Sequence, residues 1–141
     1  MLRRGVDDDA LLSAFAASVL TAAEWTHEAH VRTAFLFASR FDLDEAHLRL
    51  RAGIIRLNER HGLLESSARG YFETLTRCWI VRVEDARRRS GATTSQELIA
   101  RCPELMDRML PLRHYTRERL MTVHARSVFV EPDLEPLPQL T

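Results

Sequence analysis

The feature of this sequence that most constrains its fold is a set of four helix-start signals spread along the chain. Thr26, Asp42, Thr94 and Thr116 each stand before a stretch that reads as helix, and in two cases a glutamate follows three residues later. The side chain of such a residue accepts a hydrogen bond from an N–H group of the first helical turn. No stretch alternates polar and apolar residues as a half-buried strand does. We therefore expect an all-α fold.

The helix boundaries follow from these signals and from the positions of glycine and proline. Gly62 is expected to end one helix and Pro111 another, because glycine adopts the left-handed conformation and proline lacks an N–H donor. The tail contains Pro132, Pro136 and Pro138 and is expected to be extended. The predicted main helices are 9–22, 27–41, 43–61 and 65–89, and the predicted shorter segments are 95–102, 103–109 and 117–127.

The predicted architecture is a compact bundle of four main helices with shorter helices and an extended proline-rich C-terminal tail. A chain of 141 residues suits one domain with one hydrophobic core. We expect a single helical domain over residues 1–141, in which residues 1–7 and 128–141 are extended termini.

Composition predicts a soluble globular protein of the cytoplasm. Hydrophobic residues make up 45% of the chain and charged residues 28%. No apolar run approaches the roughly 18 residues of a membrane span, and the first residues do not form a secretory signal. Twenty basic and twenty acidic residues give a formal net charge of zero, so no overall basic field attracts nucleic acid. Neither a membrane nor a nucleic acid is an expected partner.

Three residues predict details of the packing. Cys78 and Cys102 belong to no CxxC motif and are expected to be buried thiols. Gly53 lies inside a predicted helix, where glycine costs about 1 kcal/mol relative to alanine. Either a close approach of a neighbouring helix or space for a ligand would explain Gly53.

Two histidines, His27 and His30, are the main candidates for a functional site. At helical spacing both continue the apolar face of the predicted helix 27–41, whereas Glu28, Arg32 and Ser39 fall on the opposite face, which is expected to be solvated. His27 occupies the first helical position, where the helix dipole favours a neutral imidazole. A neutral imidazole serves as a metal ligand or a general base, although a single inward histidine is usually a core residue bonded to a carbonyl.

The remaining site residues are expected from the predicted helix 65–89. The spacing of the two histidines is HxxH rather than HExxH, so zinc-protease chemistry is not indicated. Two imidazoles need further ligands, and Glu73 and Thr76 lie on one partly apolar row of the later helix. His47 on the predicted helix 43–61 is a further candidate imidazole. A surface glutamate and a helix-packing threonine are the alternative interpretation of Glu73 and Thr76.

The chain resembles a group of small bacterial all-helical proteins of unassigned function, with similarity from about residue 20 to the tail. The shared patterns are W/F-[ST]-H-x-x-H-x-R, R-x-G-I-x-R-x-N, Y-H-E-T-x-T and P-D-L-x-P-L-P. The matching residues are Trp25-Thr26-His27, His30 and Arg32; Arg51, Gly53-Ile54, Arg56 and Asn58; Tyr71, Glu73-Thr74 and Thr76; and Pro132-Asp133-Leu134 with Pro136-Leu137-Pro138.

One position departs from the family pattern, because Phe72 stands where the pattern has histidine. If that histidine is an essential ligand or base in the family, this chain lacks it. The resemblance then implies either a site built from His27, His30, Tyr71 and Glu73, or a member that has lost its activity.

Our first functional hypothesis is a pocket for a small molecule or a metal ion between the predicted helices 27–41 and 65–89, in a binding protein or an enzyme. His27 and His30 are predicted as metal ligands or acid–base groups, and Glu73 as a third ligand or orienting carboxylate. Tyr71 and Thr76 are predicted hydrogen-bond donors to substrate. The expected cofactor, if the site holds one, is a divalent metal, zinc or iron.

The alternative hypothesis is a non-enzymatic interaction module or accessory subunit. In that case the histidines are buried for structural reasons, and the proline-rich tail docks on the chain itself or on a partner. A homodimer through an exposed apolar helix face belongs to this hypothesis.

Overall fold

The computed structural model of this chain describes residues 7–64, 66 and 69–140, and within them the secondary structure is entirely helical, as predicted. The longest elements are α2 (His27–Ala38), α3 (Leu43–Arg60) and α4 (Glu73–Ser90), and α1 (Asp8–Ala16) precedes them. In these residues, no helix has the length and apolar character needed to cross a membrane.

Shorter helices make up the second half of the chain. Residues 128–140 follow them without forming a helix or a strand. The shorter helices are α5 (Ser95–Arg101), the 3-10 helices η1 (Pro103–Met106) and η2 (Leu110–Arg113), α6 (Arg117–Leu120) and α7 (Val123–Ser127).

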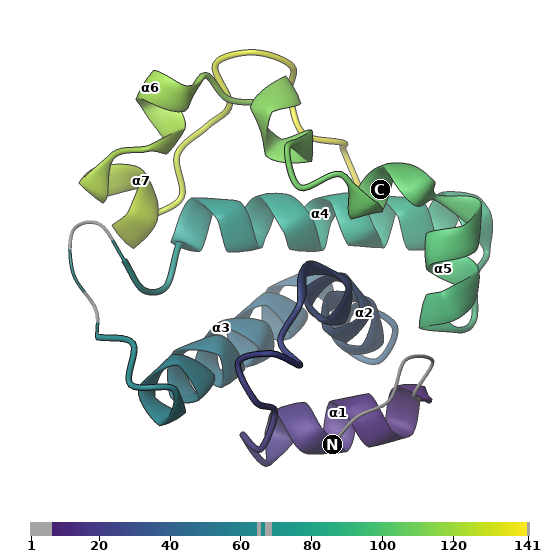
Figure 1. The fold of residues 1–141 in the computed structure, drawn as a ribbon. Helices are drawn as coiled ribbons and strands as arrows, with labels where there is room; N and C mark the ends of the chain where they lie inside the picture. Colours follow the sequence, from purple (N-terminus) through teal and green to yellow (C-terminus); the bar gives the residue numbers. More distant parts are fainter. Residues whose placement is uncertain (1–6, 65, 67–68, 141) are drawn as a thin grey trace.

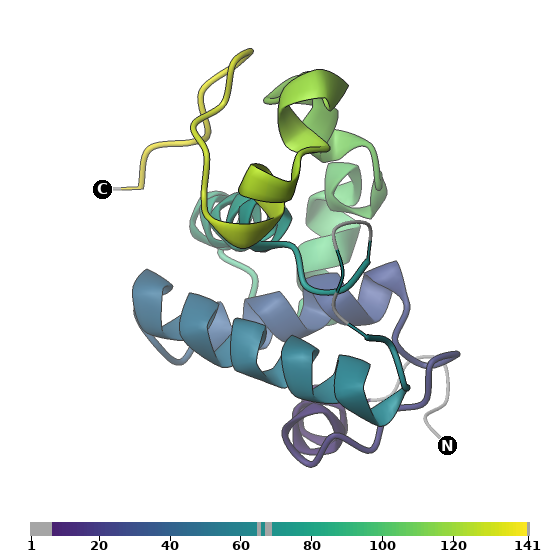
Figure 2. The ribbon, with the colours of Figure 1, turned by 90° about the vertical axis from the view of Figure 1, so that its left-hand side faces the viewer.

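Helix α4 lies in the middle of the molecule. Figure 1 shows α1, α2 and α3 on one side of it, and α6, α7 and the C-terminal segment on the other. Figure 2, turned by 90°, shows the same order with α4 seen end-on. Helix α2 contacts α1, α3, α4 and α5, and α4 also contacts α3 and α7. Helix α4 therefore packs against α2 and α3 on one side and against α7 on the other.

The hydrophobic core centres on α2, in which every residue from Val31 to Ala38 is buried. Four helices surround this segment, so both its apolar and its polar faces are removed from water. Phe35, Leu50 and Ile80 are among the most deeply buried side chains of α2, α3 and α4. Burying one such side chain contributes about 1.5–3 kcal/mol. Cys78 and Cys102 are buried free thiols, as predicted.

The four predicted helix-start signals are confirmed. The side chains of Thr26, Asp42, Thr94 and Thr116 each accept a hydrogen bond from the N–H group three residues later. Gly62 follows α3 with a φ of 72°, in the left-handed region expected after a helix C-terminus. These are local interactions, so the sequence was sufficient to predict them.

The first helix is shorter than predicted, because it ends at Ala16 instead of residue 22. Ser18 has a φ of 57°, which interrupts the helical conformation. The segment after it is held by tertiary contacts: the Leu20 side chain is buried, and His61 Nε2 donates to the Leu20 carbonyl oxygen at 2.8 Å. The connection to α2 is therefore set by α3 and not by local helix propensity.

Further boundaries differ from the prediction. Helix α4 begins at Glu73 instead of residue 65, which itself lies outside the described residues, and Gly70 with a φ of 108° precedes its start. The predicted helix 117–127 is two helices, because it breaks at Met121 and Thr122 caps α7 with its own side chain. Pro111 was predicted to end a helix but lies inside η2.

Gly53 is explained by close packing. A Cβ atom at this position of α3 would collide with the ring of Phe15, which is carried by α1. The close approach of a neighbouring helix, one of the two explanations offered by the sequence, therefore accounts for glycine here.

Arg32 on α2 is buried, contrary to the prediction that it faces solvent with Glu28 and Ser39. Its Nε donates to Ser95 Oγ at 2.7 Å, and its Nη2 lies 3.3 Å from Asp8 Oδ1. Helices α1 and α5 cover this face, which the periodicity of α2 alone does not indicate. Glu28 and Ser39 are exposed, as predicted.

The C-terminal segment is held by two residues that directly precede α6 and by one residue of α4. Tyr115 is fully buried and donates its hydroxyl to the Val130 carbonyl oxygen at 2.7 Å. The Thr116 N–H and hydroxyl both donate to Asp133, at 2.8 and 2.7 Å. On α4, the buried Thr74 hydroxyl lies 2.6 Å from the Ala125 carbonyl oxygen and accepts from the Val130 N–H at 3.2 Å.

Candidate functional site

A pocket of about 310 Å³ lies where the N-terminal end of α2, the second half of α3 and the first half of α4 meet. We call it the α2–α4 pocket. Its size falls at the lower end of the range typical of small-molecule sites. Its lining combines aromatic and aliphatic side chains with a few polar ones. The lining residues are Trp25, Thr26, His27, His30, Ile54, Asn58, Leu63, Gly70, Tyr71, Phe72, Leu75, Thr76, Trp79 and Arg108.

His27 lies in the pocket wall but has a structural partner. Its Nε2 is 2.8 Å from the carbonyl oxygen of Leu105 in η1. A carbonyl oxygen only accepts, so Nε2 carries the proton and donates it. The ring also meets Trp79 edge-on, with 4.8 Å between the ring centroids. His27 therefore ties α2 to η1 and α4.

His30 lies one turn further along α2 and makes no hydrogen bond with any described residue. Its ring packs against that of Trp25, with 5.3 Å between the centroids. Burial, followed by the electrostatic effect of the neighbouring His27, lowers the pKa of His30 to about 4. At neutral pH the ring is therefore an uncharged imidazole with acceptor capacity, in the wall of the α2–α4 pocket.

Tyr71 and Thr76 also line the pocket, but their hydroxyl groups are engaged. Tyr71 donates to Glu73 Oε1 at 2.6 Å, and Thr76 donates to the Phe72 carbonyl oxygen at 2.9 Å within the first turn of α4. Burial, together with the hydrogen bond to Glu73, raises the pKa of Tyr71 above its ordinary value. Both hydroxyls contribute to the shape of the wall, and each would have to give up a bond to donate to a ligand.

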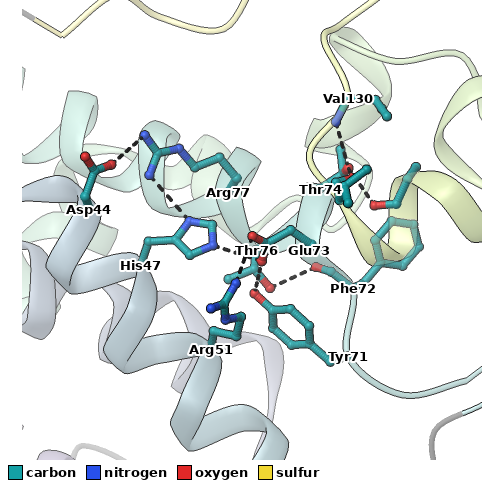
Figure 3. Close-up of polar contacts among 12 residues, drawn as sticks. Asp44, His47, Arg51, Tyr71, Phe72, Glu73, Thr74, Thr76, Arg77 and Val130 are labelled. Carbon is teal, nitrogen blue, oxygen red and sulfur yellow. Dashed lines mark hydrogen bonds and ion pairs between the residues drawn. The ribbon is translucent and has the colours of Figure 1, made fainter.

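Glu73 was predicted as a site residue but does not line the pocket, and neither does the further candidate His47. The Glu73 carboxylate accepts from Tyr71, from His47 Nε2 at 3.0 Å and from Arg51 at 3.3 Å. Figure 3 shows these side chains converging on Glu73 from α3 and from the start of α4. Burial by itself would raise the pKa of Glu73, but the hydrogen bonds and the charge of Arg51 outweigh it and hold this pKa below its ordinary value.

The contacts of Glu73 continue through His47 to a second arginine. Arg77 Nη1 lies 3.5 Å from His47 Nδ1, and Arg77 Nη2 lies 3.1 Å from Asp44 (Figure 3). We call the connected group of Asp44, His47, Arg51, Tyr71, Glu73 and Arg77 the Glu73 network. It joins α3 to α4, and both oxygens of its central carboxylate are paired.

The structure does not bring His27, His30 and Glu73 together as a set of three metal ligands. Within residues 7–64, 66 and 69–140, no group of three or more His, Cys, Asp or Glu side chains is placed to hold a metal ion. The predicted zinc or iron ion stays a prediction, and binding it would need a different ligand set or a rearrangement of these side chains.

Phe72, the position that departs from the family pattern, lies in the pocket wall directly before α4. The Arg126 guanidinium covers its ring, 4.5 Å from the centroid, which is within the range of a cation–π contact. A molecule bound in the pocket would therefore meet Phe72, and the histidine expected here from the resemblance stays a prediction.

Sequence reasoning missed two polar residues of the pocket, Asn58 and Arg108. Asn58 lies one turn after Ile54 on α3, so the helical row of Ile54 carries a signal that identifies it. Arg108 lies in the turn between η1 and η2, and no periodic pattern places that turn beside α2.

Comparison of the chain with protein-family models, with curated proteins and with solved structures gave no match. The resemblance to the small bacterial family therefore stays a prediction, and the functional argument rests on the geometry of the pocket.

Proposed function

We propose that this chain binds a small, flat, partly apolar molecule in the α2–α4 pocket, and that His30 accepts a hydrogen bond or a proton from it. The observation that carries the proposal is His30 itself, a neutral imidazole with a pKa near 4 and no hydrogen bond to a described residue, in the wall of a 310 Å³ pocket. Small-molecule sites typically place a few polar groups of this kind among apolar and aromatic side chains.

The aromatic lining supports a flat ligand. Trp25 and Trp79, the two tryptophans of the chain, both line the pocket, together with Tyr71 and Phe72. Apolar cavities of about 150 Å³ accommodate benzene, so 310 Å³ is sufficient for a two-ring aromatic body.

His30 is also the group best suited to general-base chemistry in this pocket. A neutral imidazole accepts a proton from a bound hydroxyl or amine, whereas the Nε2 of His27 nearby is already bonded to the Leu105 carbonyl oxygen. With a pKa near 4, His30 is a weak base, which favours hydrogen-bond acceptance over full proton transfer. Binding is therefore the primary function proposed, and catalysis is an extension of it.

The proposal is tested with a matched pair of probes, 2-naphthol and 2-methoxynaphthalene, which differ in one hydrogen-bond donor. We expect 2-naphthol to shift the two tryptophan indole N–H signals in NMR spectra and to bind several-fold more tightly than the methyl ether. In His30→Phe the difference between the two probes should disappear, since phenylalanine accepts no such bond. If neither probe shifts the tryptophan signals, the pocket does not bind molecules of this kind and the proposal fails.

A second candidate function, the interaction module, is supported by exposed apolar side chains on and beside α7. Met121, Val123 and Val128 are 62%, 57% and 44% exposed. The homodimer predicted from the sequence would use a face of this kind. Sedimentation measurements on the wild type and on Val123→Glu test it: a concentration-dependent dimer that the substitution dissociates would support this candidate, and a monomer at every concentration would contradict it.

A further inference from the structure

The α2–α4 pocket has a charge imbalance. Among the described residues that line it, Arg108 is the charged side chain, and the lining contains no aspartate or glutamate. Burial keeps His30 neutral at physiological pH, so the imidazole does not add a second positive charge. The described wall of the pocket thus contains one arginine and no carboxylate.

The guanidinium of Arg108 is available to a ligand. Its residue is exposed in the turn between η1 and η2, and it makes no hydrogen bond or ion pair with any side chain in the described part of the chain. Arg51 and Arg77 of the Glu73 network differ, because they pair with Glu73 and Asp44. A planar guanidinium with five N–H donors binds a carboxylate through two parallel hydrogen bonds.

Two further features of the wall favour an anion. Thr26 and His27 line the pocket, so the positive end of the α2 dipole lies beside it. Asn58 has an amide group that makes no side-chain hydrogen bond with a described residue, and its NH₂ is a donor.

We propose that the molecule bound in the α2–α4 pocket is an aromatic or alicyclic carboxylate that also carries a hydroxyl or amine. Arg108 holds the carboxylate, the ring packs against Trp25 and Trp79, and the hydroxyl or amine donates to His30. This inference rests on the proposed function and adds the chemical class of the ligand. A monoanion matches Arg108, the unpaired arginine of the described wall. A phosphate ester, which carries nearly two negative charges at neutral pH, would leave charge unpaired.

The experiment compares three probes that share one ring: 2-naphthoate, the isosteric neutral 2-naphthamide, and 2-naphthyl phosphate. Affinities are measured from the tryptophan indole N–H shifts of the full chain. We expect naphthoate to bind about tenfold more tightly than naphthamide, the ratio expected for a charge-assisted pair of hydrogen bonds. Arg108→Gln should reduce the affinity for naphthoate to that for naphthamide.

The matched control is Arg113→Gln, since Arg113 is exposed on η2, five residues from Arg108, and does not line the pocket. This variant should keep the tenfold preference.

Equal affinity for naphthoate and naphthamide in the wild type would overturn the inference while leaving the proposed function standing. Tighter binding of the phosphate would also overturn it. If none of the three probes binds, the proposed function fails and the inference with it.

Discussion

Two polar regions of this molecule meet at the first turns of α4, and they differ in how fully their groups are paired. In the Glu73 network, the carboxylate accepts from three side chains, and His47 is bonded at both ring nitrogens. In the α2–α4 pocket, His30 and Arg108 make no hydrogen bond with a described residue. The comparison separates the ionisable groups that hold the fold from those that are open to a ligand under the proposed function, because a paired buried group is costly to remove and an unpaired one is not.

The largest effect is expected at the centre of the Glu73 network. Glu73→Gln removes the negative charge that His47, Tyr71 and Arg51 all face, and should lower the free energy of unfolding by about 3 kcal/mol. Urea denaturation at pH 7 measures the loss. The matched control is Glu45→Gln, since Glu45 pairs with Arg49 on the surface, and that variant should lose less than about 0.5 kcal/mol.

A loss for Glu73→Gln no larger than the loss for Glu45→Gln would break the comparison. The Glu73 network would then contribute no more to the free energy of unfolding than a surface ion pair does. Glu73 would again be a candidate for a functional role.

The second prediction concerns pH and His30. The pKa of His30 lies near 4 in the folded chain and near 6.5 when unfolded, so the unfolded chain binds the proton more tightly. The stability contributed by neutral His30 is therefore complete above about pH 6.5 and is lost as the pH falls toward 4. Between pH 7 and pH 5 the loss should be about 2 kcal/mol.

This prediction is measured as the difference between the wild type and His30→Phe, in which the position does not titrate. Urea denaturation at pH 7, 6 and 5 should show the wild type losing stability faster than the variant. If the stabilities of the two proteins change equally with pH, His30 is readily protonated in the folded chain. The proposal that His30 is a neutral hydrogen-bond acceptor in the pocket would then be wrong.

The smallest expected effect is a difference in stability between the variants His27→Phe and His30→Phe. His27→Phe keeps an aromatic ring against Trp79 but leaves the Leu105 carbonyl oxygen without its donor, and should cost about 1–2 kcal/mol at pH 8. His30→Phe should cost less than about 0.5 kcal/mol at the same pH, since no hydrogen bond to a described residue is lost. Thermal denaturation of both variants checks the order. If His30→Phe costs more than His27→Phe, His30 is the structural histidine and His27 is the better candidate for contact with a ligand.

Several parts of the structure were predictable because they depend on neighbours in sequence. The caps at Thr26 and Asp42 are contacts between residues three apart, and the helical period places His27 and His30 on one face. Both histidines do line one pocket. The fold class follows from the same local signals, and the described residues are all-helical.

The period of a single helix does not say which neighbour covers each face. Arg32 was expected to face solvent but is buried, because α1 and α5 pack on that side of α2 and supply Asp8 and Ser95. Glu73 was grouped with the histidines, whereas α3 presents His47 and Arg51 to it. In each case the partner lies more than 20 residues away along the chain.

The sequence by itself determined the helical class, the main helix starts and the shared face of His27 and His30, since each depends on hydrogen bonds or side-chain directions within a few residues. The tertiary structure alone decided that His27 bonds to Leu105, that Glu73 is enclosed by α3, and that Arg108 reaches the pocket. Those outcomes depend on how separate helices pack, and packing is selected by the burial of the whole apolar surface and not by any one segment.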